Sequence, residues 1–176
     1  MTLIAKILSN PTYEPPEILL ELDLNNGLKG LLGSPIVSRE ILVRFAIGEA
    51  ELVLPVFEEV YPSDDRPRKA IQAAQEWLVN PNKVYADAAV EAAAAAWAAA
   101  DTAYARAAAA YAAARAAYYA AAAAGAADGA TAWAAYWAAA GAAYWVREAD
   151  PSITVEDQIR RFFELFGSPV GCRGVG

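Results

Sequence analysis

The side chains of this chain that could do chemistry are mainly carboxylates, because histidine is absent and cysteine occurs only at Cys172. Histidine is the commonest general base and the commonest metal ligand. A single cysteine forms neither an internal disulfide nor a thiolate zinc site, which favours a reducing compartment. Cys172 lies in a glycine-rich tail with no histidine to activate it. We therefore predict that the protein is not an enzyme and uses no metal or cofactor.

The densest group of charges follows the segment ELVLPVFEEVYPS and reads DDRPRK. Its adjacent acids Asp64 and Asp65 stand beside Arg66, Arg68 and Lys69. Nearby bases keep carboxylates ionised, which suits helix capping and salt bridges better than general-acid catalysis. We expect these acids to cap a helix, with Pro67 in its first turn.

One further carboxylate pair, Asp87 and Glu91, has the i, i+4 spacing that could hold a metal if a second pair faced it. Between Glu91 and Arg147 the following tract supplies only Asp101 and Asp128 as additional acids, and no glycine-rich phosphate loop occurs. A carboxylate metal site is therefore a weak hypothesis.

An alanine tract over residues 84–149 carries aromatic residues at seven-residue intervals. They are Trp97, Tyr104, Tyr111 and Tyr118, and a second set contains Trp133, Trp137 and Tyr144. One interpretation is a packing seam in which aromatics replace leucine. The other is a pocket for a small planar anionic ligand, with Arg106 or Arg115 pairing the anion. Tyrosine hydroxyls need partners when buried, which keeps the second interpretation open.

The net charge of −7 is concentrated before residue 66, where eleven acidic residues face four basic ones. Residues 66–176 hold ten of each. Helical spacing from residue 40 predicts a charged face made of Glu40, Arg44, Ile47, Glu51, Leu54 and Glu58. It predicts a core face made of Ile41, Phe45, Leu52, Val56 and Val60. The charged face is either a solvated surface or a site for a basic protein. Nucleic acid is a poor partner, because no basic stripe exists.

The hydrophobic pattern predicts an all-α fold of about six or seven helices, centred on an alanine-rich antiparallel hairpin. We expect a leucine-rich appendage over 1–35, a helical domain over 36–167 and a flexible tail over 168–176. The first expected helix spans 16–26, although the alternation of Leu20, Leu22 and Leu24 would also suit a short strand. The next helix starts at Ser34-Pro35 or at Ser38 and runs to about Tyr61 with a kink at Pro55. Further helices are expected over 63–80 and over 84–124, the latter broken near Asp101-Thr102, a break against which the unbroken seven-residue spacing argues. The hairpin then turns between Gly125 and Gly129, with Asp128 as the next N-cap. A last amphipathic helix, ending at Gly167, should lie over the hairpin as a lid through Ile159, Phe162, Phe163 and Phe166.

Residues 129–146 form an uncharged stretch of borderline length for a membrane span. They lack the leucine and isoleucine that drive insertion, and the N-terminus shows no signal-peptide pattern. We expect a cytoplasmic protein. Its alanine-faced helices could also pair between chains, so a homo-oligomer remains open.

The segment ELVLPVFEEVYPSDDRPRKAIQAAQEWL followed by alanine-rich helices resembles the Imm-five-like family of immunity proteins. The resemblance covers roughly residues 46–145 and rests on the V-L-x-x-F-E and D-D-R-P-R-K-A-I motifs. Trp133 and Trp137 stand where that family tends to carry histidines. The first 35 residues and the lid helix look like additions. The resemblance also extends to alanine- and tyrosine-rich relatives that occur in phage genomes.

The resemblance implies a non-enzymatic, protein-binding neutraliser of a toxin, a nuclease or, for a phage protein, a host defence effector. The candidate partner-binding residues are Glu51, Glu58, Asp64, Asp65, Arg66, Arg68 and Lys69. The DDRPRK motif is either a hinge that sets helix register or a direct partner contact. The alternative function is a protein that sequesters a small molecule, such as a nucleotide signal, in the aromatic pocket.

Overall fold

Helices make up the regular structure of the residues that the computed structural model describes, which are 32, 37–104, 107–129 and 132–166. The six helices are α4 (Arg39–Val60), α5 (Arg66–Val79), α6 (Lys83–Tyr104), α7 (Ala108–Gly129), α8 (Ala132–Ala149) and α9 (Val155–Phe166). No strand occurs in these ranges. The all-α prediction is confirmed, and the helix expected over 16–26 lies outside the described residues.

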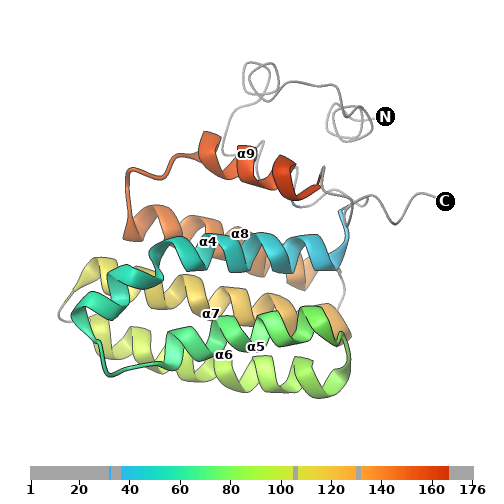
Figure 1. The fold of residues 1–176 in the computed structure, drawn as a ribbon, viewed down its shortest axis with the longest axis horizontal. Helices are drawn as coiled ribbons and strands as arrows, with labels where there is room; N and C mark the ends of the chain where they lie inside the picture. The colour runs from blue at the N-terminus through green and yellow to red at the C-terminus, as the bar shows by residue number, and fades with distance from the viewer. Residues whose placement is uncertain (1–31, 33–36, 105–106, 130–131, 167–176) are drawn as a thin grey trace.

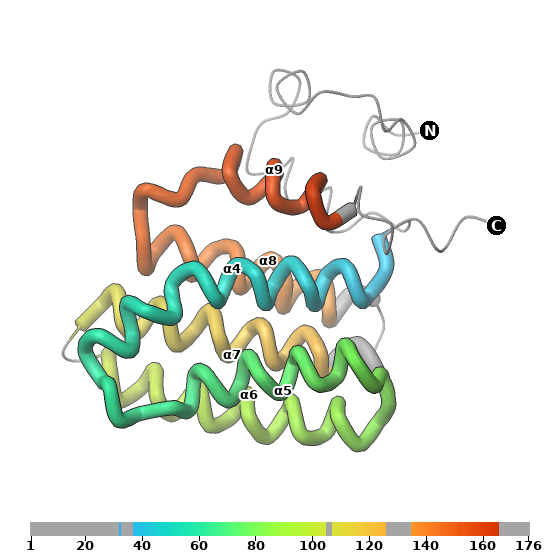
Figure 2. Tube along the Cα trace, viewed as in Figure 1, coloured from blue at the N-terminus to red at the C-terminus, as the bar shows by residue number. Residues whose placement is uncertain are grey.

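The alanine-rich tract forms three successive antiparallel helices, α6, α7 and α8 (Figures 1 and 2). The middle helix, α7, is the centre of the fold, since it packs against α4, α5, α6 and α8. Its alanines are almost completely buried from Ala112 to Ala117. Alanine permits this arrangement because its small side chain lets several helix backbones approach one axis at once.

Local signals set the ends of α4 and α5 as the sequence predicts. Ser38 caps α4, and its hydroxyl accepts a hydrogen bond from the Ile41 N–H at 3.3 Å. The helix continues past Pro55 to Val60. Asp65 occupies the N-cap position of α5 but its side chain makes no capping hydrogen bond, and Pro67 lies in the first turn.

The buried face of α4 is not the one predicted. Leu52 and Val60, which we expected in the core, are each 46% exposed, and Val56 is half-buried. Ile47 and Leu54, which we placed on the charged face, are buried. The reason is that α4 packs against α5, α7, α8 and α9, so the arc that faces other helices includes positions that one core face would leave in water.

The break predicted near Asp101-Thr102 is confirmed a few residues later, because α6 ends at Tyr104 and α7 begins at Ala108. The predicted boundary at Gly125 is wrong, since α7 continues to Gly129 and includes Asp128. Gly125 serves helix packing instead. A Cβ atom at this position would lie 2.5 Å from Cγ2 of Val90 on α6.

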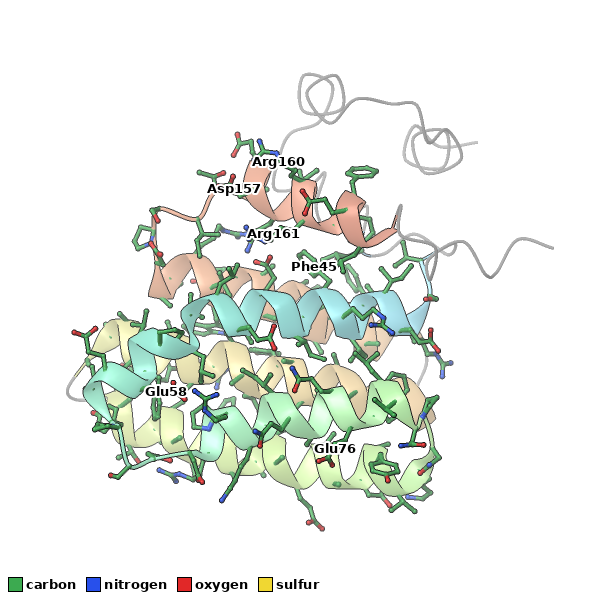
Figure 3. All side chains as sticks on the ribbon, in the orientation of Figure 1. Phe45, Glu58, Glu76, Asp157, Arg160 and Arg161 are labelled. Carbon is green, nitrogen blue, oxygen red and sulfur yellow. The ribbon has the colours of Figure 1, made fainter. Side chains whose placement is uncertain are left out.

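The lid helix α9 forms and lies over α8, the second arm of the expected hairpin, and also over α4 (Figure 1). The Thr154 hydroxyl accepts from the Asp157 N–H, and the Asp157 carboxylate accepts from the Thr154 N–H, which fixes the start of α9. Phe162 of α9 packs edge-on against Phe45 of α4 at a centroid distance of 6.0 Å, and Figure 3 labels Phe45 on the side of α4 that faces α9. None of the described helices is long and apolar enough to cross a membrane.

Candidate functional site

The DDRPRK motif makes its closest contacts within the chain. The Asp64 carboxylate accepts from Nε and Nη2 of Arg66 at 2.8 and 2.6 Å. The same carboxylate accepts from the Arg66 backbone N–H at 3.2 Å, which satisfies one free donor at the start of α5. The Arg66 hydrogen bond holds the pKa of Asp64 below its usual range. Asp64 therefore remains ionised and orders the turn before α5.

Two further ion pairs use the rest of the motif. Arg68 donates through Nε and Nη2 to both oxygens of Glu58 at 2.8 and 2.7 Å, which ties α5 to the end of α4. Lys69 pairs with Asp65 one turn earlier at 2.9 Å. These contacts support the hinge interpretation of the motif, because they connect consecutive elements.

Glu51 is exposed on α4 and accepts a hydrogen bond from Gln75 of α5 at 2.6 Å. Because Gln75 is neutral, the charge of Glu51 is not cancelled by this contact. Glu58 differs, since Arg68 neutralises it. The two glutamates that we expected to act together therefore present different charges to a partner.

The seven-residue aromatic pattern folds back on itself at the turn between α6 and α7. Tyr104 meets Tyr111 across that turn at a centroid distance of 5.2 Å, and Trp97 meets Tyr118 farther along at 5.0 Å. The four rings therefore form two facing pairs rather than one stripe on a single helix. Tyr104 is 72% exposed and Trp97 is 40% exposed, so the pairs reach the surface.

Arg115 lies at the centre of these rings and is only 7% exposed. Its guanidinium carbon is 3.6 Å from the centroid of the Trp97 ring. Four more rings surround it at 5.1 to 6.0 Å, those of Tyr111, Tyr118, Tyr119 and Trp145. We call Arg115 and these five rings the aromatic cage. The cage brings together α6, α7 and α8.

Part of the predicted pocket takes part in the cage. Trp97, Tyr111, Arg115 and Tyr118 belong to it, and Tyr104 borders it through Tyr111. Trp137 instead contacts Tyr136 and is exposed. Arg106 and the side chain of Trp133 lie outside the described residues.

Sequence reasoning missed Tyr119, Trp145 and Gly141. A Cβ atom on Gly141 would lie 2.6 Å from the Tyr119 ring, so this glycine leaves the space that the ring fills. The i, i+4 spacing of Arg115 and Tyr119 was a usable signal for their contact. Nothing in the sequence indicates that Trp145 of α8 reaches the same arginine.

A second missed group of polar residues connects α4, α8 and α9. Glu49 is 1% exposed and accepts from Nε of Arg161 at 2.7 Å and from the amide of Gln158. Gln158 also donates to the Ala143 carbonyl at 2.8 Å and accepts from Arg147. Burial lowers the pKa of Arg147, and the nearby charge of Glu49 opposes that shift. Glu49 falls in the pattern Ala46, Glu49, Ala50, Val53, which is the spacing of a buried face.

The described residues contain no group of three or more histidine, cysteine, aspartate or glutamate side chains that could hold a metal ion. Asp87 pairs with Lys83 at 2.8 Å.

Comparison with known families matches residues 36–164 to the family described as "Imm-5 like putative immunity protein". The match extends into α9, so the expectation that the lid helix is an addition is wrong. It begins at residue 36, after the leucine-rich segment. No curated protein and no solved structure matches the chain.

Proposed function

The chain belongs to the Imm-5 like family of immunity proteins, and from this premise we propose that it binds and neutralises a basic protein without chemical turnover. The partner would be a toxin or nuclease or, if the chain acts for a phage, a host defence effector. Neutralisation by binding requires a complementary surface rather than a set of reactive groups.

One observation carries this proposal, the sign of the charges that remain unpaired at the surface. In the described residues, exposed Arg68, Lys69, Lys83 and Arg160 all form salt bridges, and Arg39 also has an interaction. The exposed carboxylates without a salt bridge are more numerous. They are Glu40, Glu51, Glu59, Glu76, Glu91, Asp101, Glu148 and Glu164. The surface therefore presents net negative charge, which attracts a basic partner and speeds association.

The DDRPRK residues take a supporting part in this proposal. Arg66, Arg68 and Lys69 are paired with Asp64, Glu58 and Asp65, so a partner would have to break those contacts to use them. Glu51 of α4 and Glu76 of α5 are better placed to meet a partner, because both are exposed and neither has a basic partner (Figure 3 labels Glu76). We propose that this α4–α5 surface is the docking side.

The test starts from the full-length chain as bait. Partners captured from a host or competitor lysate at low and at high salt are identified by mass spectrometry, and each is then purified for a direct binding assay. We expect a basic protein whose activity is blocked at a stoichiometric ratio and whose association slows as salt rises. An acidic partner, or a catalytic amount of this chain sufficing to inactivate the partner, would contradict the proposal.

The small-molecule function is the second candidate, and Arg115 is the observation that favours it. This buried cation has no carboxylate partner among the described residues. A charge that only stabilised the fold would be expected to have one. The chemistry of that residue is developed next.

A further inference from the structure

Arg115 is a buried cation whose hydrogen bonds are incomplete. Its Nη2 donates to the Tyr119 hydroxyl at 3.3 Å, and its Nε is buried without any acceptor. A guanidinium has five N–H donors, and a buried donor without an acceptor costs about 1–3 kcal/mol. Arg66 and Arg68 differ in this respect, because each uses Nε and Nη2 together to bind a carboxylate.

The aromatic cage compensates the charge of Arg115 but not its donors. A ring face attracts a cation from above, as the Trp97 ring does at 3.6 Å. The N–H groups point outward in the plane of the guanidinium, where they need oxygen acceptors. Only the Tyr119 hydroxyl supplies one from the described residues. The Nε edge therefore has an unused donor of the kind that binds oxyanions.

Exposed aromatic rings adjoin this site. Trp97 stacks on the guanidinium and is 40% exposed, and Tyr104 contacts Tyr111 of the cage. On α8, exposed Tyr144 contacts Trp145 of the cage at a centroid distance of 5.1 Å. Flat, partly exposed rings beside a cation are suited to a ligand that is itself flat and negatively charged.

We infer that Arg115 anchors a binding site for an oxyanion, a carboxylate or a phosphate, carried on a flat aromatic or heteroaromatic ring. The oxyanion accepts from the Nε edge of Arg115, and the ring stacks against the exposed aromatics around Trp97. This inference does not rest on the acidic α4–α5 surface, which belongs to other helices.

The experiment uses the full-length chain and two ring-bearing acids, adenosine 5′-monophosphate and benzoate, which separate phosphate from carboxylate ligands. Adenosine, inorganic phosphate and acetate are the matched probes that lack one half of the ligand. Binding is followed by calorimetry and by tryptophan fluorescence, since Trp97 and Trp145 both lie against the guanidinium. We expect at least one ring-bearing acid to bind at least about tenfold more tightly than the matched probes that lack its ring or its acid group.

Arg115→Met tests the anchor, because methionine fills an apolar cage without donors. We expect at least about a tenfold loss of affinity with an unchanged or higher melting temperature, since the change removes a buried donor that lacks an acceptor. If Arg115→Met does not fold, Arg115→Lys serves instead, because it keeps the charge and loses the fork of donors. Arg160→Met, at an exposed arginine of α9, is the control and should bind as the wild type does.

Three results would overturn the inference. The first is no saturable binding of either acid up to millimolar concentration. The second is equal affinity for the ring-bearing acids and their separate halves. The third is undiminished binding in a folded Arg115 variant, which would make the arginine a purely structural part of the cage.

Discussion

Two buried charged side chains, Glu49 and Arg115, differ in how their charge is satisfied. The carboxylate of Glu49 has a salt bridge to Arg161 and a hydrogen bond from Gln158, while Arg115 has rings and a single hydroxyl. A buried ion with oppositely charged and hydrogen-bonding partners holds elements together, and losing one partner leaves the others uncompensated. A buried ion without them is a candidate for ligand binding. The two residues therefore have different expected responses to mutation.

Glu49→Ala should destabilise the protein by about 3–5 kcal/mol, because it leaves Arg161 and Gln158 without their buried acceptor. The measurement is the free energy of unfolding from urea denaturation followed by circular dichroism. Glu51→Ala, two residues along the same helix but exposed, is the matched control and should change stability by less than about 0.5 kcal/mol. Equal effects of the two substitutions would show that the Glu49 contacts do not anchor α9.

Asp64→Asn should reduce stability at neutral pH and lose that effect in acid. Arg66 lowers the pKa of the folded Asp64 carboxyl, so its contribution is present above the pKa of the unfolded group and disappears as pH falls through the lowered value. Urea denaturation of the wild type and of Asp64→Asn at pH 7 and at about pH 3 measures the difference in their free energies of unfolding. Asp87→Asn, in an exposed pair within α6, should have a smaller effect at pH 7. A wild-type advantage that grows in acid would contradict the assignment.

At the scale of the helices, glycines set how closely the alanine-rich elements approach. Gly141 of α8 faces the Tyr119 ring of α7, while Gly48 of α4 has no atom within 4 Å of the position a Cβ would take. All three alanine-rich helices depend on such contacts, because alanine offers no large side chain to fix their spacing. Aromatic rings fitted beside glycine or alanine then determine the register.

Gly141→Ala should destabilise the protein by about 1–3 kcal/mol, since the added methyl group overlaps the Tyr119 ring and a well-packed site cannot absorb it. Gly48→Ala should stabilise it by about 0.4–1 kcal/mol, because alanine restricts the unfolded chain without a clash. Thermal melts of both variants check the opposite signs. Stabilisation by both substitutions would mean that Tyr119 moves freely and does not fix the spacing of α7 and α8.

At the scale of the whole molecule, the charge imbalance of the sequence is partly cancelled in the fold. The bases that cancel it come from beyond residue 65, since Arg66, Arg68, Lys69 and Arg161 pair with Asp64, Glu58, Asp65 and Glu49. What remains negative is the exposed surface, which includes Glu51 and Glu76. These two residues, rather than Glu51 with Glu58, are the informative pair for a charge reversal.

Glu51→Lys with Glu76→Lys should slow association with the basic partner and weaken the salt dependence of the association rate. Stopped-flow binding over a salt series measures both quantities once the partner is identified. Folding should change little, because both positions are exposed. Glu51→Gln with Glu76→Gln is the control for shape and should give an intermediate rate. A double lysine variant that melts normally and associates at the wild-type rate would exclude the α4–α5 surface.

The sequence by itself determined the helical class, most helix ends and the absence of histidine-based chemistry, because these follow from local spacing, capping residues and composition. Ser38 and Pro67, for example, act on helix starts only a few residues away. Only the tertiary structure decided which distant helices meet. It buried Glu49 beneath α9, placed α9 on α4 and α8, and folded the aromatic pattern into facing pairs around Arg115. Such contacts depend on packing between segments whose alanines carry almost no positional information, so the chain pattern alone could not specify them.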